Sequence, residues 1–298
     1  MKDSQPPICD YEGSDYQTSF WELGGRQYED QSEDIALRRL LPAHGELMLE
    51  LGAGAGRNTQ RYVGFKQVVL LDYSLTQLTQ AMQRLGRNQR YIYVAADIYN
   101  LPFVDGLFDT ATMIRTLHHM TEPRAALHQV RRTMKTGAIF ILEYANKQNL
   151  KAILRYFSRR QSWSPFSLER VEFEKLNFDY HPKMVRNWLS ESGFTLERQL
   201  AVSYFRLGVL KKYLPLNLLT RMDAILQPTG NWCQLSPSIF TRSHAVGDTQ
   251  KASDGMFFKC PVCQADFLKP HKASLICQGC SREWLIREGI FDFRVNAD

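Results

Sequence analysis

The stretch MLELGAGAGRNTQ, Met48 to Gln60, places three glycines at alternate positions directly after an apolar run. An apolar run that ends in such glycines is typical of the first strand of an α/β domain, followed by a turn that closely approaches another group. Counting from Gly52 puts Arg57 where the dinucleotide pattern G-x-G-x-x-G needs its third glycine. The turn instead reads E-x-G-x-G-x-G, and Glu50 would suit a cationic amino group better than a pyrophosphate.

Short apolar runs and helical patterns alternate on both sides of this turn. Runs rich in Val, Ile and Leu, separated by helices, are what a parallel sheet covered on both faces requires. We therefore predict a doubly wound α/β domain, including a helix directly after the glycines. The segments that carry this prediction are ELMLEL, QVVLLD, LTQLTQAMQRL, YIYVAAD, FDTATMI, PRAALHQVRRTMK and AIFILEYA.

The length of 298 residues allows such a domain and a smaller second one. Further strands are predicted at Phe194 to Leu200 and Pro237 to Ser243, a capping helix at Gln31 to Leu41, and an apolar helical insertion at Leu207 to Gln227, broken at Pro215. The predicted units are an N-terminal arm and capping helix (1–45), the α/β domain (46–243, with a cofactor half 46–145 and substrate-side segments 146–235), a linker (244–255) and a cysteine-rich domain (256–298).

Composition narrows the class of protein. Hydrophobic residues make up 44% and charged residues 23% of the chain, as in ordinary globular proteins. No apolar run is long enough to be a transmembrane segment, and the first residues lack the pattern of a secretory signal, so we expect a cytoplasmic protein. The formal charge of +6 would help to attract RNA, phosphorylated substrates or an anionic membrane surface without selecting among them.

Four of the six cysteines form two C-x-x-C pairs, CPVC and CQGC, with thirteen residues between them. Two such pairs can place four thiolates tetrahedrally around one zinc ion, so Cys260, Cys263, Cys277 and Cys280 are the predicted ligands. Four cysteines leave no open position for a catalytic water, which indicates a structural zinc. Two disulfides or four unrelated buried thiols are the alternatives, and the missing export signal argues against the disulfides.

The region from Glu46 to Ala145 resembles the class I S-adenosylmethionine-dependent methyltransferases, close in style to the ubiquinone and menaquinone C-methyltransferases. The resemblance lies in LELGAGAGR, QVVLLD, AADIYNLPF, FDTATMIRTLHHM and VRRTMKTGAIFILEYA. It implies S-adenosylmethionine as cofactor, held by Glu50, Gly52, Ala53, Gly54, Gly56, Asp72, Tyr73, Asp97, Ile98, Ile114 and Arg115. By this resemblance Asp72 takes the ribose hydroxyls, Asp97 the adenine amino group, and Ile114 and Arg115 line the sulfonium.

Each of these residues has a simpler interpretation. A carboxylate accepts hydrogen bonds only and two vicinal hydroxyls offer two donors, which supports Asp72 as a ribose ligand. Asp72 and Asp97 could also be helix caps or turn residues. His118, His119 and Arg115 are the candidates for a catalytic role, although methyl transfer requires mainly alignment and exclusion of water, and no general base is assigned. Four aromatic residues could form a lid or cover a hydrophobic edge: Tyr11, Tyr16, Phe20 and Trp21.

The cysteine-rich tail, Met256 to Val295, resembles the small zinc-ribbon activator that partners methyltransferases of tRNA, ribosomal RNA and release factors. In the usual strand order of the methyltransferase fold, YIYVAAD is an edge strand whose unpaired backbone needs a cover. The resemblance implies that the ribbon pairs with this edge at Tyr91 to Val94. We expect Phe257, Trp284 and Phe291 to contribute to the docking.

The methyl acceptor remains open among three hypotheses. A small or lipid-like molecule is favoured by the apolar insertion and by the resemblance to the quinone group. RNA or a translation protein is favoured by the activator-like tail and by Lys147 to Arg186, which carries nine Lys and Arg against four Asp and Glu. A solvated amphipathic helix also explains that charge. The third hypothesis is a cofactor-binding regulator without turnover. Asn231, Trp232 and Gln234 are candidate pocket residues, and the sequence does not indicate an oligomeric state.

Overall fold

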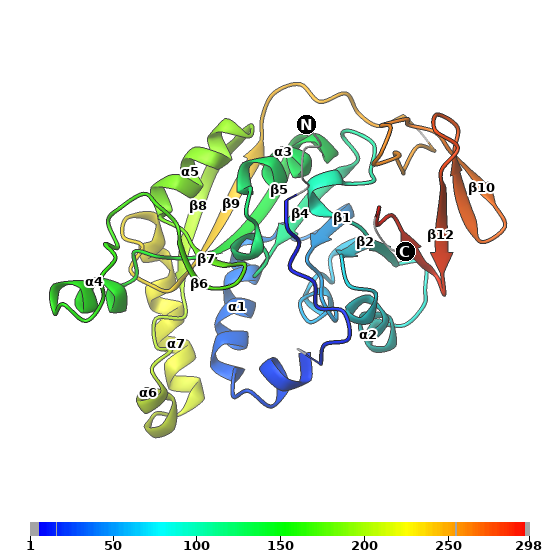
Figure 1. Cartoon of the computed structure of the whole chain (residues 1–298). Helices are drawn as coiled ribbons and strands as arrows, with labels where there is room; N and C mark the ends of the chain where they lie inside the picture. The colour runs from blue at the N-terminus through cyan, green and yellow to red at the C-terminus, as the bar shows by residue number, and fades with distance from the viewer. Residues whose placement is uncertain (1–5, 16, 254, 296–298) are drawn as a thin grey trace.

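A large mixed sheet organises the protein, and its strands run through both predicted domains (Figure 1). The computed structural model describes residues 6–15, 17–253 and 255–295. Across these residues, eleven strands form one sheet in the order β10-β11-β12-β13-β3-β2-β1-β4-β5-β9-β8. The strands are β1 (Gly45–Leu51), β2 (Phe65–Asp72), β3 (Tyr91–Ala95), β4 (Phe108–Met113), β5 (Met134–Ala145), β8 (Phe194–Val202), β9 (Ser238–Ala245), β10 (Leu268–His271), β11 (Ser274–Cys277), β12 (Glu283–Arg287) and β13 (Ile290–Asp292).

The central strands β3, β2, β1, β4 and β5 are parallel, and helices cover both faces of the sheet. Alternation along β1 divides the core, because Met48 packs with the apolar residues of α2 while Leu49 packs with those of α3 and α5. The predicted doubly wound α/β architecture is confirmed. The helices are α1 (Gln27–Leu40), α2 (Leu75–Leu85), α3 (Pro123–Thr133), α4 (Leu150–Phe157), α5 (Pro182–Glu191), α6 (Gly208–Tyr213) and α7 (Leu216–Leu226).

The prediction of a helix directly after the glycines is wrong, because only one 3₁₀ turn, Thr59–Arg61, lies between β1 and β2. The side chains of this segment are drawn instead toward α1, where Arg61 lies 2.7 Å from Asp30 and Arg57 lies 2.7 Å from Glu33. These ion pairs hold the connection beside α1. A single turn also supplies no helix dipole, so any ligand at the glycines meets individual backbone amides.

The later elements follow the predictions, with small shifts. β8 and β9 occur where strands were expected, and α1 begins four residues earlier than the predicted capping helix. The apolar insertion forms α6 and α7, and Pro215 directly precedes α7. A small hairpin, β6 (Val171–Glu174) and β7 (Asn177–Asp179), was not predicted. No helix in the described ranges has the length and apolar character needed to cross a membrane.

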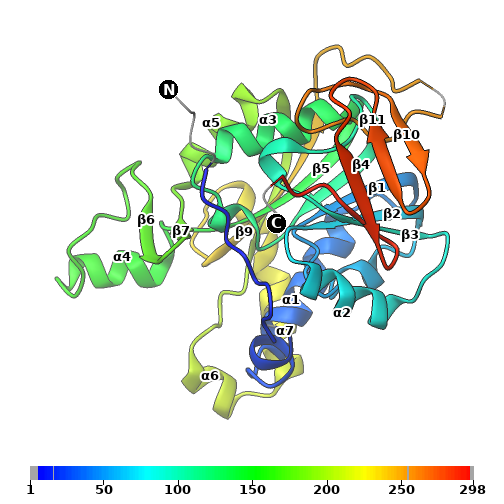
Figure 2. The same ribbon diagram turned by 45° about the vertical axis from the view of Figure 1, so that its right-hand side comes forward.

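The cysteine-rich tail docks on the predicted edge strand, at Tyr93 to Ala95 and not over the whole predicted range Tyr91 to Val94 (Figure 2). β13 pairs in parallel with β3, with Ile290 opposite Tyr93 and Phe291 opposite Val94. Phe257 packs edge-to-face on Phe103, with ring centroids 6.0 Å apart. Trp284 is buried and packs on Phe293, whose amide donates to the carbonyl oxygen of Ala95 at the end of β3.

Candidate functional site

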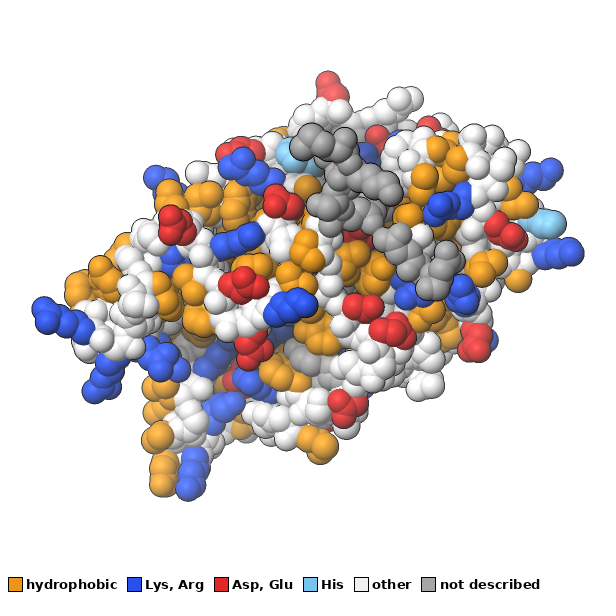
Figure 3. Space-filling model, viewed as in Figure 1, with side chains coloured by type: hydrophobic (Ala, Val, Ile, Leu, Met, Phe, Trp, Pro, Cys, Tyr) orange, Lys and Arg blue, Asp and Glu red, His pale blue; other side chains and the backbone are white. Residues whose placement is uncertain are grey.

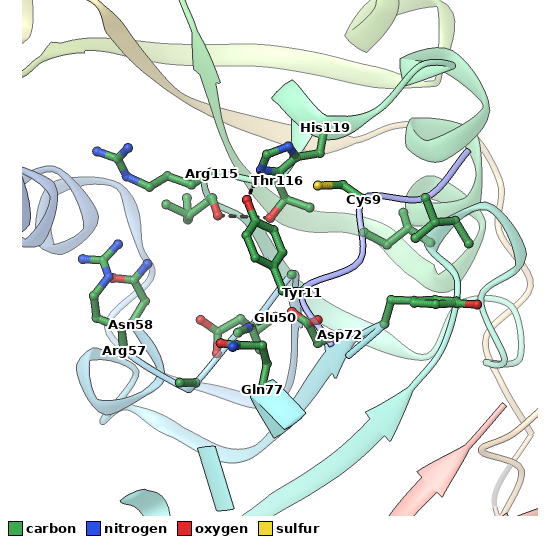
Figure 4. Close-up of a pocket in the computed structure, with 18 of the residues that line it drawn as sticks. Cys9, Tyr11, Glu50, Arg57, Asn58, Asp72, Gln77, Arg115, Thr116 and His119 are labelled. Carbon is green, nitrogen blue, oxygen red and sulfur yellow. Dashed lines mark hydrogen bonds between the residues drawn. The ribbon is translucent and has the colours of Figure 1, made fainter. Parts of the chain in front are cut away.

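One cavity lies at the carboxyl ends of the parallel strands, and most of the predicted cofactor residues line it (Figure 4). Parallel α/β sheets bind ligands at this edge because the loops after the strands converge there. The predicted residues that line the cavity are Glu50, Gly52, Ala53, Gly54, Asp72, Tyr73, Asp97, Ile98, Ile114, Arg115 and His119. Gly56 and His118 are not among the lining residues.

Each of the three glycines lies against a different part of the protein. A Cβ atom on Gly52 would lie 2.1 Å from the hydroxyl oxygen of Thr116, so the Thr116 side chain occupies the space that a side chain at position 52 would need. A Cβ on Gly54 would meet only Gln77, at 3.8 Å, so this residue opens toward the cavity. A Cβ on Gly56 would press on Leu85 of α2. Gly54 is therefore the glycine that leaves room for a ligand.

Asp72 and Asp97 lie at the ends of neighbouring strands and hold the backbone around the cavity. Asp72 accepts hydrogen bonds from the amides of Gly54 at 2.8 Å and Ser74 at 3.0 Å. Asp97 caps a 3₁₀ turn by accepting from the amide of Tyr99 at 2.9 Å. Burial raises the pKa of both carboxyl groups. The turn and cap contacts considered as alternatives thus exist, in residues that also line the cavity.

Glu50 is a buried acid on the floor of the cavity. Its carboxylate accepts hydrogen bonds from the hydroxyl groups of Thr59 at 2.5 Å and Tyr62 at 3.2 Å. Burial raises its pKa to about 7, although these hydrogen bonds lower it. A cation placed beside Glu50 would lower that pKa again, because an opposite charge favours the ionised form.

The N-terminal arm covers the cavity, and sequence reasoning recognised only part of it. Tyr11 and Trp21 line the cavity, as does Cys9, which was not predicted. Phe20 is not among the lining residues and packs edge-to-face on Trp21. Tyr16 lies outside the described residues. The aromatic residues of the arm indicated a possible lid, but nothing in the sequence distinguished those that face the cavity.

His119 connects the arm to the rest of the site. The hydroxyl of Tyr11 lies 3.2 Å from Nε2 of His119, and Nδ1 of the same ring lies 2.8 Å from the carbonyl oxygen of Leu176. A carbonyl can only accept, so Nδ1 carries the proton and Nε2 accepts from Tyr11. Burial lowers the pKa of His119, in keeping with a neutral ring. Such a ring orients the arm and holds its proton on the side away from Tyr11.

A buried ion-pair cluster flanks Trp21. Glu33 of α1 accepts a hydrogen bond from Nε of Arg115 at 2.6 Å and from Arg57 at 2.7 Å. Burial alone would raise the pKa of Glu33, but the two guanidinium groups outweigh it and bring the pKa to about 2. Both guanidinium groups also lie over the Trp21 ring, at 3.6 Å for Arg57 and 4.7 Å for Arg115. The guanidinium group of Arg115 is thus engaged by Glu33 and Trp21, and Arg115 acts as a positioning residue for the arm.

A second polar region lies behind Arg115. Glu143, at the end of β5, accepts from the Arg115 amide at 2.9 Å. Nδ1 of His118 and Nε of Arg206 are buried without a hydrogen-bond partner among the described residues. Burial raises the pKa of Asp179 to about 7, with Arg206 opposing that effect. His118 therefore belongs to this region and not to the cavity wall, and sequence reasoning missed the other members because they come from distant segments.

The four cysteines of the tail form a candidate metal centre. Their sulfur atoms all lie within 4.8 Å of one another, with Cys260 and Cys280 3.8 Å apart and Cys263 and Cys277 3.3 Å apart. Four thiolates bound tetrahedrally to zinc at about 2.3 Å have sulfur separations of about 3.8 Å. Gly279 fits the same arrangement, because its amide donates to the Cys277 sulfur at 3.3 Å and a Cβ there would crowd Cys263. The residues fit a zinc ion.

The tail also touches the wall of the cavity. Arg294, just beyond β13, donates a hydrogen bond to the carbonyl oxygen of Tyr73 at 3.5 Å and pairs with Asp292 at 2.9 Å. It also lies 3.9 Å from Glu12 of the arm, which accepts from the Leu75 amide at the start of α2 at 2.8 Å. The docked tail therefore supports both the Tyr73 wall and the arm.

Comparison with known proteins shows similarity to methyltransferases. Residues 49–142 match the family model described as a methyltransferase domain. The chain is 30% identical over 147 residues to the O-methyltransferase cnsE of Penicillium expansum, a match covering 45% of this chain and 52% of that protein. It is 28% identical over 153 residues to the demethylmenaquinone methyltransferase of Clavibacter sepedonicus, covering 51% of this chain and 62% of that one.

Among solved structures, a complex between the Haloferax volcanii Trm112 methyltransferase activator and a methyltransferase aligns with a TM-score of 0.55 and 14% identity. That match covers 78% of this chain and 96% of the other. This chain therefore has the Rossmann-like fold of S-adenosylmethionine-dependent methyltransferases, with four close cysteines that fit a small zinc-binding unit. The matches to the two curated relatives span less than two thirds of their length.

Proposed function

We propose that this protein is an S-adenosylmethionine-dependent methyltransferase. The observation that carries the proposal is the convergence of Glu50, Asp72 and Asp97, from the ends of three neighbouring strands, on one cavity beside the open glycine turn. Carboxylates at these positions can accept from an ammonium group, a ribose and an adenine amino group. The matched methyltransferase domain covers the same residues, which supports the proposal.

Each part of the site has a separate task in this proposal. Asp72 binds the ribose hydroxyls with the acceptor positions that the Gly54 and Ser74 amides leave free. Asp97 and Ile98 flank the adenine, while Glu50 and Gly54 receive the methionine end. Ile114 and Arg115 line the part of the cavity that receives the sulfonium. When bound, the cofactor supplies a methyl group on a good leaving group, so the protein's own work is mainly alignment and exclusion of water.

The arm performs that exclusion. Tyr11 and Trp21 lie over the cavity, anchored by His119 and by the guanidinium groups of Arg57 and Arg115. The neutral His119 ring is held between Tyr11 and Leu176, which leaves it as a positioning residue for the lid and assigns it no proton transfer.

We further propose a small or lipid-like methyl acceptor. The name of the Clavibacter sepedonicus relative, a demethylmenaquinone methyltransferase, supports an acceptor of this class. RNA or a translation protein is the alternative acceptor, supported by the structural likeness to a Trm112 activator complex. In either case the four cysteines would bind a structural zinc ion, since no ligand position is left for a substrate.

Labelled cofactor tests the activity and the acceptor together. We expect the zinc-loaded protein, incubated with S-adenosylmethionine labelled in its methyl group and fractionated cell extract, to transfer label into the solvent-extractable pool. Label in RNA or protein would replace the lipid-like acceptor by the alternative. Measured affinity for the cofactor without transfer to any fraction would contradict an enzyme and leave the cofactor-binding regulator.

Glu50 gives the proposal a pH signature. With a pKa of about 7 in the free protein, Glu50 is about half protonated at pH 7, and a bound ammonium group would expel that proton. Calorimetric titration with S-adenosylhomocysteine in buffers of different ionisation enthalpy should therefore report release of about half a proton at pH 7. Glu50→Gln should abolish this component. An unchanged proton count in Glu50→Gln would contradict the placement of the ammonium group.

The same shift has a consequence for stability. Because the folded pKa of Glu50 lies above the ordinary value of 4.5, folded protein holds its proton more tightly than unfolded protein. Its contribution is present below pH 4.5 and is lost as pH rises toward 7, by about 3 kcal/mol over those 2.5 pH units. The free energy of unfolding of Glu50→Gln should show a weaker decline over this pH range.

A further inference from the structure

Two segments with exposed apolar side chains project near the end of the sheet that carries β8 and β9 (Figures 1 and 2). One comprises α4 and the loop that follows it, and the other comprises α6 and the start of α7. Neither segment contributes to the cavity wall or to the cysteine cluster. Their side chains therefore need an explanation separate from the proposed methyl transfer.

α4 carries its apolar stripe on the outside. Leu150, Leu154 and Phe157 follow one another at helical spacing and are 47%, 61% and 71% exposed. Ala152 is the buried residue of this helix and lies on the opposite face. An amphipathic helix of a globular protein ordinarily turns its apolar stripe toward the core. In α4 the stripe faces solvent, and Figure 3 shows apolar and basic side chains together at this projection.

The segment is held in a fixed shape. The ring of Phe166, in the following loop, lies 6.1 Å from that of Phe157 and 6.2 Å from that of Tyr156. The buried ammonium group of Lys147 donates to the carbonyl oxygen of Ser167 at 3.0 Å and to its hydroxyl at 2.6 Å. The apolar side chains are thus presented on an anchored loop.

The charged residues within the segment that carries the stripe have one sign. From Tyr144 to Leu168 the sequence has five Lys and Arg and no Asp or Glu. Lys147 is buried, and the other four are exposed: Lys151, Arg155, Arg159 and Arg160. Their side chains form no ion pair with a described residue. On the helix, Lys151 and Arg155 flank the apolar stripe on one side.

The second projection repeats this combination. α6 has no buried residue, and Leu207, Val209 and Tyr213 are exposed beside Lys212. Exposed aliphatic side chains next to exposed bases are the composition of helices that lie in a membrane interface, where the apolar face enters the acyl boundary and the bases meet anionic headgroups.

We propose that residues 150–160, here called the α4 surface, bind the surface of an anionic lipid bilayer, with the helix lying in the plane of the interface. RNA would also attract the bases and could stack on the aromatic rings. It would gain nothing from Leu150 and Leu154, whose exposure is accounted for by a hydrocarbon partner. Membrane binding by the α4 surface is a property separate from the proposed methyl transfer, since it does not depend on the cofactor site.

Vesicle binding tests this surface with the full zinc-loaded chain. We expect co-sedimentation with vesicles of phosphatidylcholine mixed with phosphatidylglycerol, and little with phosphatidylcholine alone. Arg155→Gln should weaken the vesicle affinity about fivefold, because each base near an anionic surface contributes about that factor. Leu154→Asp should weaken it about tenfold or more. Val63→Asp, at a 77% exposed position elsewhere, is the matched control and should bind as the unmodified protein does.

The outcomes separate the surface from its alternatives. Binding of transfer RNA that Leu154→Asp leaves intact, together with no vesicle binding, would overturn the proposal. Equal vesicle affinity of Leu154→Asp and Val63→Asp would do the same. Affinity for S-adenosylhomocysteine should be the same in all these variants, which verifies their fold and keeps failure of the membrane proposal distinct from failure of the proposed methyl transfer.

Discussion

Cys277→Ser is expected to abolish zinc binding, unfold the cysteine-rich tail and expose the edge of the central sheet at β3. A structural zinc site contributes about 10 to 16 kcal/mol of apparent binding energy, which is enough to decide whether a domain of this size folds. Cys277 ends β11 and lies 3.3 Å from the Cys263 sulfur, so its loss removes one of four ligands from a shared centre.

The edge then loses its partner. β13 pairs with β3 through Ile290 to Asp292, and an unfolded tail cannot hold that register. Amides of β3 that the tail protects should exchange with solvent about 100-fold faster or more, because they change from sheet to open edge. The variant should also aggregate more readily, since an unpaired edge is a template for further strands.

Cys233→Ser is the matched control, because Cys233 is exposed and does not belong to the cluster. It should keep full zinc content and unchanged exchange rates. Cofactor affinity of Cys277→Ser should fall but persist, since Arg294 supports Tyr73 while the acids on the other strands remain. Full zinc stoichiometry in Cys277→Ser, or unchanged protection of β3, would contradict the ligand assignment or the docking, respectively.

Asp72→Asn should weaken binding of S-adenosylhomocysteine about 100-fold or more. Hydrogen bonds to a charged group contribute about 1.5 to 3 kcal/mol each, and the proposed ribose contact uses two of them. The amide also loses an acceptor for the Gly54 and Ser74 backbone groups, so the glycine turn loosens at the same time. Isothermal titration calorimetry measures the affinity.

Asp109→Asn separates cofactor binding from stability. Asp109 also accepts from two backbone amides, those of Glu46 at 2.8 Å and Leu47 at 3.1 Å, but at the opposite end of the strands. Both variants should lower the melting temperature, because each replaces a charged acceptor of two backbone amides by a weaker, neutral one. Only Asp72→Asn should lose affinity. An equal loss in both variants would mean that the effect of Asp72 is structural.

Local patterns predicted most of the sheet. Val68 to Leu71 are completely buried, and a fully apolar run of this kind has few alternatives to a central parallel strand. The docking of the tail on β3 was expected from the resemblance of the tail to zinc-ribbon activators, and the apolar strand with an unpaired edge supplied the physical reason. The helix after the glycines failed because periodicity cannot show that Arg57 and Arg61 pair with α1.

The cavity was predictable on one side only. Asp72 and Asp97 were found because they lie in motifs that resemble those of class I methyltransferases, and the strand ends that carry these motifs meet at one edge of a parallel sheet. Glu33 and Cys9 were missed, because they reach the site from the chain ahead of β1 and no spacing links them to it. Buried ion pairs between distant segments, such as Glu33 with Arg115, depend on tertiary geometry that a single sequence does not display.

The parallel pairing of β13 with β3 has a consequence for biogenesis. Every other strand of the sheet is synthesised before β13, so the edge of β3 stays unpaired until the tail has folded, which a zinc ion on the four cysteines would promote. During that interval the unpaired edge would be open to aggregation, and its protection would depend on the supply of zinc. Metal starvation would accordingly act on the yield of newly made protein, while molecules completed earlier keep their shape.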